Sequence, residues 1–457
     1  MTQFSHDNEQ PLLRSLFAKG ESLDQAIGLE AELAVLDLET GVSVPYEGPK
    51  GLQSLLKTIA AESSFNCTYE KENLMILSRD GFSLQLEHGG AIEYSSKPAT
   101  NLKQLVADLK IALRLIVDAA SHLGVAVVPG GNFPFNTPEN TSWVPKHRGR
   151  IMRDYFEALG NDGAGGLRVM SETLSTQVTL DYASEADMSL KMRTLVAAAP
   201  IVSAMFSNSP LDDGRPSGAL SRRAEHYFTC DPKRSGFVPP ALGRLMSFTD
   251  FIEWALDVPM IYRATPSGYE SADFQTFRTV LRDGFADHTR PDEAHWRSHL
   301  SQIYTDVRLR DTIELRAVDG APVNLIPAVV ALWTGLAYHR PSLLAAWELF
   351  SQKSVKEHHD ALREIPFKGL HAHSGGDPVI DIARELLRLA KDGFNSRVAA
   401  GLEDPNSLTY FEPLTELLDA RVTLAERCLL DWEGRLEQTA ARYVDAYRVN
   451  ASQIENL

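Results

Sequence analysis

The segment from Val307 to Pro322, VRLRDTIELRAVDGAP, alternates charged and apolar residues. Successive side chains of a strand point to opposite sides. Read as one β-strand, the segment therefore carries five polar residues on one face: Arg308, Arg310, Thr312, Glu314 and Arg316. Three guanidinium groups beside a carboxylate suit anionic oxygens and a metal ion. For a charged strand taken alone, a solvated sheet surface is the alternative.

Further carboxylates and one amide lie on three other predicted strands. Residues 26–38 carry Glu30 and Glu32 on one face, and residues 82–96 carry Glu87 and Glu93 around a Gly-Gly pair that is typical of a bulge or tight turn. Residues 175–182 carry Gln177. Five carboxylates on one sheet face would repel one another unless cations lay among them. Oxygen ligands of this kind favour Mg²⁺ or Mn²⁺ over zinc.

Arginines next to such a metal site indicate phosphoryl transfer from a nucleotide. A guanidinium group binds phosphate oxygens in two places at once, and this chemistry depends mainly on positioning and charge neutralisation. A single Glu-x-Glu pair is more often a solvated edge strand, so the prediction depends on the whole set. The glycine-rich segment at 160–166, GNDGAGG, lacks the Gly-Lys-Ser/Thr ending of a phosphate loop, and we predict a plain loop there.

The elements that position these residues form a mixed α and β pattern. Apolar residues three and four apart predict helices at 51–62, 101–123, 184–206, 325–338, 341–352, 377–393 and 412–447. Strands and helices neither alternate strictly nor separate, which favours an α+β fold with a mostly antiparallel sheet. No repeat or long linker marks a boundary. We therefore expect a single catalytic domain over residues 1–457, with a C-terminal helical part at roughly 325–457.

Composition limits the partners and the location of the chain. Its 457 residues carry a net charge of −16, which argues against binding to nucleic acid or to an anionic membrane. Three widely spaced cysteines form no zinc or disulfide pattern and fit a reducing compartment. There is no signal-peptide pattern, and no uncharged stretch reaches the roughly 18 residues of a membrane span. We expect a cytoplasmic protein, monomeric or homodimeric, that acts on small molecules.

At these residues the sequence resembles the plant-type glutamate–cysteine ligases, a family also found in many bacteria. The similar segments follow in family order over nearly the whole chain: GLEAE at 28–32, LEHGGAIEYS at 86–95, STQVTLDY at 175–182, SEADM at 184–188, FSNSP at 206–210, LDVPM at 256–260 and HLSQIYTDVRLRDTIELRAVDGAP at 299–322. The resemblance implies a glutamine-synthetase-like catalytic fold, in which an antiparallel sheet forms a funnel and helices pack outside it.

The resemblance also implies a reaction and a set of roles. Such ligases use ATP and Mg²⁺ to phosphorylate the γ-carboxylate of glutamate, and the cysteine amine then attacks the acyl phosphate to give γ-glutamylcysteine, a step of glutathione biosynthesis. Arg316 would face the transferring phosphate, and Arg308 and Arg310 would help to hold ATP or a substrate carboxylate. The metal-binding positions match six residues of this chain: Glu30, which is also assigned to catalysis, Glu32, Glu87, Glu93, Gln177 and Glu314.

The departures from the family lie on the substrate side. Thr179 stands at a usual Asn, Glu172 at a common Arg and His88 at a Pro, and the segment around Tyr227 also differs. We expect Thr179 and Tyr227 to contact substrate. Two alternatives to the cysteine ligase follow. One is a relative that joins glutamate or another amino acid to a different amine in a specialised pathway. The other is a catalytically silent homologue, which predicts broken metal positions, and no such position is broken.

Overall fold

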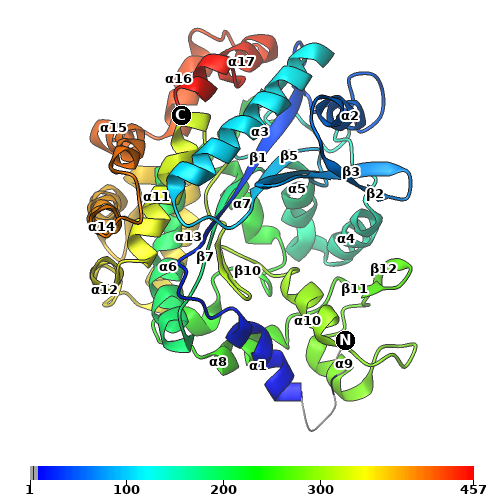
Figure 1. Ribbon diagram of the computed structural model, residues 1–457, viewed down its shortest axis with the longest axis vertical. Helices are drawn as coiled ribbons and strands as arrows, with labels where there is room; N and C mark the ends of the chain where they lie inside the picture. Colours follow the sequence, from blue (N-terminus) through cyan, green and yellow to red (C-terminus); the bar gives the residue numbers. More distant parts are fainter. Residues whose placement is uncertain (1–3, 5–8) are drawn as a thin grey trace.

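The strands predicted from alternating sequence form one antiparallel sheet in the computed structural model, which describes residue 4 and residues 9–457 (Figure 1). Most of the polar N-terminal stretch therefore lies outside the described residues. The strand order is β14-β15-β7-β1-β5-β4-β3-β2, and β6 also pairs with β1. The bounds are β1 Ile27–Asp37, β2 Asn66–Glu70, β3 Asn73–Ser78, β4 Phe82–Leu86, β5 Ile92–Ser96, β6 Val125–Val128, β7 Thr176–Leu180, β14 Val307–Leu309 and β15 Ile313–Leu315. A mixed α and β fold with an antiparallel sheet is thus confirmed.

Strand β1 is the longest strand and runs through the middle of the molecule (Figure 1). Its first half pairs with β7 on one side and with β5 on the other, and its second half, residues 34–37, pairs with β6. Leu29, Ala31 and Leu33 on one face are buried, so the alternation of the sequence gives the sheet one apolar face.

Four helices pack against the apolar face: α2 (Leu52–Glu62), α3 (Leu102–Leu123), α6 (Glu185–Met205) and α11 (Ile326–Ala337). Side-chain caps fix where two of them begin. The Asn101 side chain accepts a hydrogen bond from the Gln104 amide at the start of α3, and Ser184 accepts one from the Asp187 amide at the start of α6. Among the described helices, none has the length and apolar character to cross a membrane.

The chain beyond residue 325 is mainly helical. Its elements are α11, α12 (Arg340–Glu348), α13 (Val355–Lys368), α14 (Val379–Ala399), α15 (Glu412–Ala420), α16 (Leu424–Glu433), α17 (Ala440–Tyr447) and α18 (Ala451–Glu455), with a short hairpin at 373–378. The prediction of one helix at 412–447 is wrong. Arg421 adopts a left-handed conformation at the end of α15, and Thr423 with Glu426 forms a capping box that begins α16.

Residues 307–322 do not form the single strand that their alternation predicts. Strands β14 and β15 are two short arms of a hairpin joined at residues 310–312, where the Arg310 amide donates a hydrogen bond to the Thr312 carbonyl at 2.8 Å. The polar Arg-Asp-Thr sequence interrupts the strand, since aspartate favours turns. Arg308 lies directly opposite Glu314 in the hairpin register, so the charged face is kept.

The glycine-rich segment at 160–166 is not a plain loop either. A 3-10 turn (Gly160–Gly163) leads into helix α5 (Ala164–Glu172). A β-carbon on Gly166 would lie 2.1 Å from the ring of Phe156, so the glycine allows α5 to pack closely on α4 (His147–Ala158). These glycines therefore serve helix packing.

Candidate active site

The register of the sheet collects the predicted polar residues on its second face. Glu30 lies opposite Gln177 of β7 and opposite Ser95 of β5. Glu32 lies opposite Glu93 of β5, and Glu93 lies opposite Gln85 of β4. Four neighbouring strands thus place oxygen-bearing side chains in two adjacent rows across the sheet.

Hydrogen bonds hold the carboxylates of this face in place. Gln85 and Ser95 both donate to the same oxygen of Glu93, each at 2.5 Å. Glu32 accepts from the Ser175 backbone amide at 2.6 Å and from the Gln177 side-chain amide at 3.4 Å. These donors are neutral, so they orient the carboxylates without balancing their charge.

The raised pKa values of the carboxylates indicate that a cation would stabilise their ionised form. Burial, followed by repulsion from Glu30 and Glu87, raises the pKa of Glu93 well above its usual range. Burial and Glu87 raise the pKa of Glu32 to about 7, and burial and Glu314 raise the pKa of Glu30. A divalent cation among these oxygens would take the place of the protons that such groups otherwise bind.

The arginines gather around Glu314 at one side of the same face. Arg308 Nε donates to Glu314 Oε2 at 2.6 Å, Arg310 pairs with Oε1, and Arg316 Nη1 lies 3.8 Å from Oε2. Arg316 also donates to Gln177 Oε1 at 2.6 Å. Burial raises the pKa of Glu314, but the three arginines outweigh it and lower the pKa overall. The structure therefore places Glu314 in contact with guanidinium groups, at the border of the carboxylate set.

Glu87 occupies a different electrostatic position from the other carboxylates. It follows β4, and its side chain lies 3.4 Å from Lys146 Nζ just before helix α4. Burial raises its pKa, yet Lys146, His88 and Arg148 outweigh this and lower it. No sequence pattern predicted Lys146, because it lies in a loop without periodic spacing.

Thr179 and Tyr227 lie on different elements near the arginine group. Thr179 is on β7, opposite Glu314 on one side and Gly28 on the other. Tyr227 lies in a 3-10 turn after helix α7 (Arg222–His226), and the Arg223 guanidinium lies 5.1 Å from its ring centroid.

Arg223 is a buried residue that the sequence analysis missed. It donates to the carbonyl oxygens of Arg316 at 2.6 Å and Ala317 at 3.3 Å, and so fixes α7 against the end of β15. Arg223 comes from a segment with mixed polar and apolar residues and no clear period, so no sequence pattern predicted it as a site residue.

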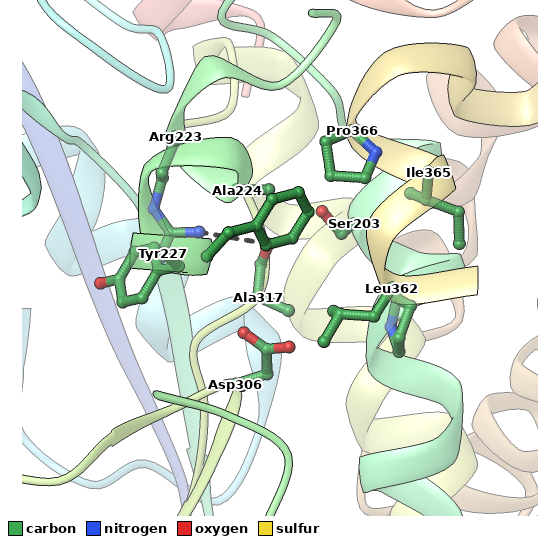
Figure 2. A pocket seen from close by; sticks show the side chains of 12 residues that line it. Ser203, Arg223, Ala224, Tyr227, Asp306, Ala317, Leu362, Ile365 and Pro366 are labelled. Atoms are coloured by element: carbon green, nitrogen blue, oxygen red, sulfur yellow. Dashed lines mark hydrogen bonds between the residues drawn. The ribbon is translucent and has the colours of Figure 1, made fainter. Parts of the chain in front are cut away.

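A pocket opens beside Arg223 and Tyr227 (Figure 2). Figure 2 shows Arg223, Tyr227 and Asp306 on one side and Leu362, Ile365 and Pro366 of α13 on the other. Burial raises the pKa of Asp306 to about 6, although Arg223 and Arg316 both lower it. The pocket thus combines a carboxylate and a guanidinium group with an apolar wall, which suits a small molecule that carries both an amine and an apolar part.

Comparison with known proteins places the chain in a family. A sequence model described as glutamate-cysteine ligase family 2 matches residues 26–442. The chain belongs to this family. The chloroplastic glutamate–cysteine ligase of Medicago truncatula is 30% identical over 421 residues, which cover 92% of this chain and 80% of that protein. The corresponding protein of Arabidopsis thaliana is 30% identical over 415 residues, with 90% and 77% covered.

Solved structures support the fold. The glutamate–cysteine ligase of Francisella tularensis, determined in complex with AMP, has a TM-score of 0.55 at 12% identity and covers 95% of this chain and 92% of that one. A bifunctional glutathione synthetase from Pasteurella multocida has a TM-score of 0.51 at 13% identity, with 97% and 54% covered. At these identities the similarity concerns the fold alone.

The prediction of a cytoplasmic protein is contradicted by this comparison. The plant relatives, including those of Medicago truncatula, Oryza sativa and Arabidopsis thaliana, are all named chloroplastic. The prediction relied on the lack of an apolar signal segment, and organelle-targeting segments are amphipathic and basic instead. The lack of a secretory signal segment therefore did not establish the compartment.

Proposed function

We propose that the chain is an ATP-dependent glutamate–cysteine ligase that forms γ-glutamylcysteine through a γ-glutamyl phosphate intermediate. The observation that carries the proposal is the polar sheet face, on which carboxylates and arginines lie side by side in a member of this family. We further propose that the sheet forms the wall of a glutamine-synthetase-like funnel, and that the protein works as a monomer or homodimer on small-molecule substrates.

The carboxylate set fits a hard divalent cation, with Mg²⁺ as the first choice and Mn²⁺ as the second. Oxygen ligands would come from one face of the sheet: Glu30, Glu32, Glu87, Glu93, Gln177 and, at the border, Glu314. Buried carboxylates that raise one another's pKa are the groups that such an ion would stabilise. When bound, the ion neutralises charge on the nucleotide phosphates.

The arginines would bind the charges that move during the reaction. A γ-carboxylate oxygen of glutamate attacks the terminal phosphorus of ATP and ADP leaves, while Arg316 stabilises the charge on the transferring group. Arg308 and Arg310 would hold ATP or the substrate carboxylate. The amine nitrogen of the acceptor then attacks the acyl carbon, and phosphate leaves as the C–O bond breaks. The amine proton passes to a positioned base, for which Asp306 is available, or to the departing phosphate.

A metal-ligand variant tests the proposal directly. We expect Glu30→Gln and Glu314→Gln each to lower ADP release with glutamate, cysteine and Mg²⁺ by about 100-fold or more, because a charged group at the reacting phosphates is lost. Glu39→Gln, at an exposed position just beyond β1, is the matched control. Unchanged turnover in the first two variants would remove these residues from the site.

The pocket beside Tyr227 favours a second candidate, a ligase with another amine acceptor. Its apolar wall from α13 suits an acceptor other than cysteine. Thr179, which lies on β7 opposite Glu314, also stands where the resembling family has Asn. A panel of amino acids and simple amines, assayed for ADP release with glutamate, separates the two. The cysteine ligase requires cysteine to give the highest kcat/KM, and the second candidate requires a different amine to exceed it.

A further inference from the structure

A second group of possible metal ligands lies where three segments distant in sequence meet. Glu172 ends helix α5, Asp212 lies in strand β8 (Leu211–Asp212), and His226 ends helix α7. One ligand atom from each lies within 4.8 Å of the other two. We propose that Glu172, Asp212 and His226 bind a divalent transition-metal ion, separate from the Mg²⁺ that the catalytic face would hold.

The imidazole of His226 points to a ligand at this position. The residue is 6% exposed, and its Nε2 atom has no hydrogen-bond partner among the described residues. Asp212 Oδ1 is also buried and lacks such a partner. Leaving buried polar atoms unpaired is costly, and both atoms belong to residues of this cluster. An ion between them would satisfy both at once.

The carboxylates in and around the cluster outnumber the guanidinium groups, so the net charge favours a cation. Arg168 pairs with Glu172 and lies 3.6 Å from both Asp212 and Asp213. Arg222 binds Asp212 Oδ2 at 2.8 Å and Glu225 at 2.5 Å. Four carboxylates thus face two guanidinium groups, an excess of two negative charges.

Arg222 and Arg168 each bind one oxygen of a cluster carboxylate, as the groups that surround a metal site commonly do. Arg222 holds Oδ2 of Asp212, and Arg168 holds Oε2 of Glu172. Asp212 Oδ1 has no hydrogen bond among the described residues and lies 3.6 Å from Arg168 Nη1. The Oε1 atom of Glu172 receives only a long hydrogen bond from Thr141, at 3.4 Å. Ligating carboxylates are usually oriented in this way by hydrogen bonds to their second oxygen.

The donor types select the class of metal. One imidazole with two carboxylates is a ligand set that suits Zn²⁺, Co²⁺ and related ions, with a further position open to water, whereas the catalytic face offers oxygen atoms alone. A bound ion would connect α5, β8 and α7. Because α7 also carries Arg223, it would hold that arginine against the end of β15.

Cobalt binding to the full-length protein tests the proposal without any activity assay. The chain is treated with a chelator, dialysed into excess Mg²⁺ and titrated with Co²⁺, with bound metal and visible absorption both measured. We expect one Co²⁺ per chain with the absorption of an imidazole-ligated ion. His226→Gln and Asp212→Asn should each weaken this binding by about tenfold or more.

Two control variants make the result specific. His358 is 2% exposed and also has a buried Nε2 without a partner among the described residues, but it lies in α13 outside the cluster, so His358→Gln should bind Co²⁺ like the wild type. Glu30→Gln should also keep this site, because it alters only the catalytic face. Binding that survives both His226→Gln and Asp212→Asn, or a wild-type protein without such a Co²⁺, would overturn the proposal. Failure of the ligase assay would leave these results unaffected.

Discussion

At the scale of single residues, the polar sheet face is divided by the sign of its charges. Glu30, Glu32 and Glu93 lie on the central strands, where burial and mutual repulsion raise their pKa values. The arginines lie at the β14–β15 side and keep Glu314 ionised. We propose that the carboxylate half binds a cation and the arginine half binds an anion, as a metal–nucleotide pair would require.

Arg316 is the residue for which shape should matter as much as charge. It donates to Gln177 and lies near Glu314, so its planar guanidinium group is held at the junction of the two halves. We expect Arg316→Lys to lower kcat by about 100-fold, since an ammonium group cannot bind two phosphate oxygens at once as a guanidinium group does. Steady-state kinetics checks this. Arg297→Lys, at a half-exposed arginine paired with Asp311, should leave kcat unchanged.

Asp306 should make stability depend on pH. Its pKa is raised from 3.8 to about 6, so the folded state binds more protons than the unfolded state between about pH 4 and 6, and stability from this group falls as pH rises through that window. We therefore expect the free energy of unfolding of Asp306→Asn, relative to that of the wild type, to increase from pH 4 to pH 7. Urea unfolding at both pH values measures the gain.

The control for that measurement is an aspartate of similar chemistry at the surface. Asp154 has a side chain that is 67% exposed, so Asp154→Asn should show the same difference from the wild type at both pH values. A pH-independent difference for Asp306→Asn would contradict the assignment of the shift to Asp306.

The residues that sequence alone could identify are those on strands. A period of two places Glu30 and Glu32 on one face, and the same alternation places Arg308 and Glu314 on one face, opposite each other in the hairpin. The residues missed lie in aperiodic segments: Lys146, Arg223 and Asp306. Their contacts depend on the tertiary path of the chain, which local spacing does not encode.

At the scale of elements, the helices α11 and α14 approach each other through two glycines. A β-carbon on Gly335 would lie 2.1 Å from the Ala390 carbonyl oxygen, and one on Gly393 would lie 1.9 Å from the Gly335 carbonyl oxygen. Both contacts are to backbone, which cannot move aside like a flexible side chain. The two helices can therefore pack this closely only with glycine at these positions.

This close packing makes Gly393 sensitive to a single methyl group. We expect Gly393→Ala to lower the free energy of unfolding by about 1–3 kcal/mol, despite the higher helix propensity of alanine. Urea unfolding monitored by circular dichroism tests this. Gly130→Ala is the matched control, because its β-carbon would meet neighbours only at 3.5 Å and beyond. Equal stability of the two variants would contradict this prediction and show that α14 can move away from α11 to admit the methyl group.

The elements with strong period and clear caps were predicted well, and the short or interrupted ones were not. Helix α3 begins at its asparagine cap, and β4 and β5 flank their Gly-Gly turn. Residues 307–315 fold as a hairpin, and 412–447 as three helices, because local turn and cap residues override a periodic pattern that continues across them. The helix at 164–172 was hidden by its glycines, whose role lies in packing.

At the scale of the whole molecule, buried polar contacts join the C-terminal helix α14 to the segments just before β1 and α3. Arg397 of α14 donates to Gln25 Oε1 at 2.5 Å and to the Thr100 carbonyl at 3.1 Å, and it pairs with Glu403 at 3.1 Å. Glu403 in turn accepts from the Leu102 amide at the start of α3. These links support our proposal that residues 1–457 act as one catalytic domain.

Breaking this buried pair should destabilise the whole chain. We expect Arg397→Leu to cost about 3–5 kcal/mol in the free energy of unfolding, because Glu403 would stay buried without its partner. Arg388 in the same helix is 56% exposed in its pairs with Glu385 and Asp392, so Arg388→Leu should cost about 1 kcal/mol at most. Denaturant unfolding should remain a single transition in both, and two transitions would contradict the single-domain proposal.

The place of each strand in the sheet also sets how the site can open. Strand β1 has neighbours on both sides, whereas β14 lies at one of the two edges of the described sheet, with β2 at the other. Amide hydrogens of β1 should therefore exchange with solvent only when the domain unfolds, while those of β14 should exchange through local opening of the edge. On the roles proposed above, opening of this edge would expose Arg308 to nucleotide, while the carboxylates of β1 would stay in place.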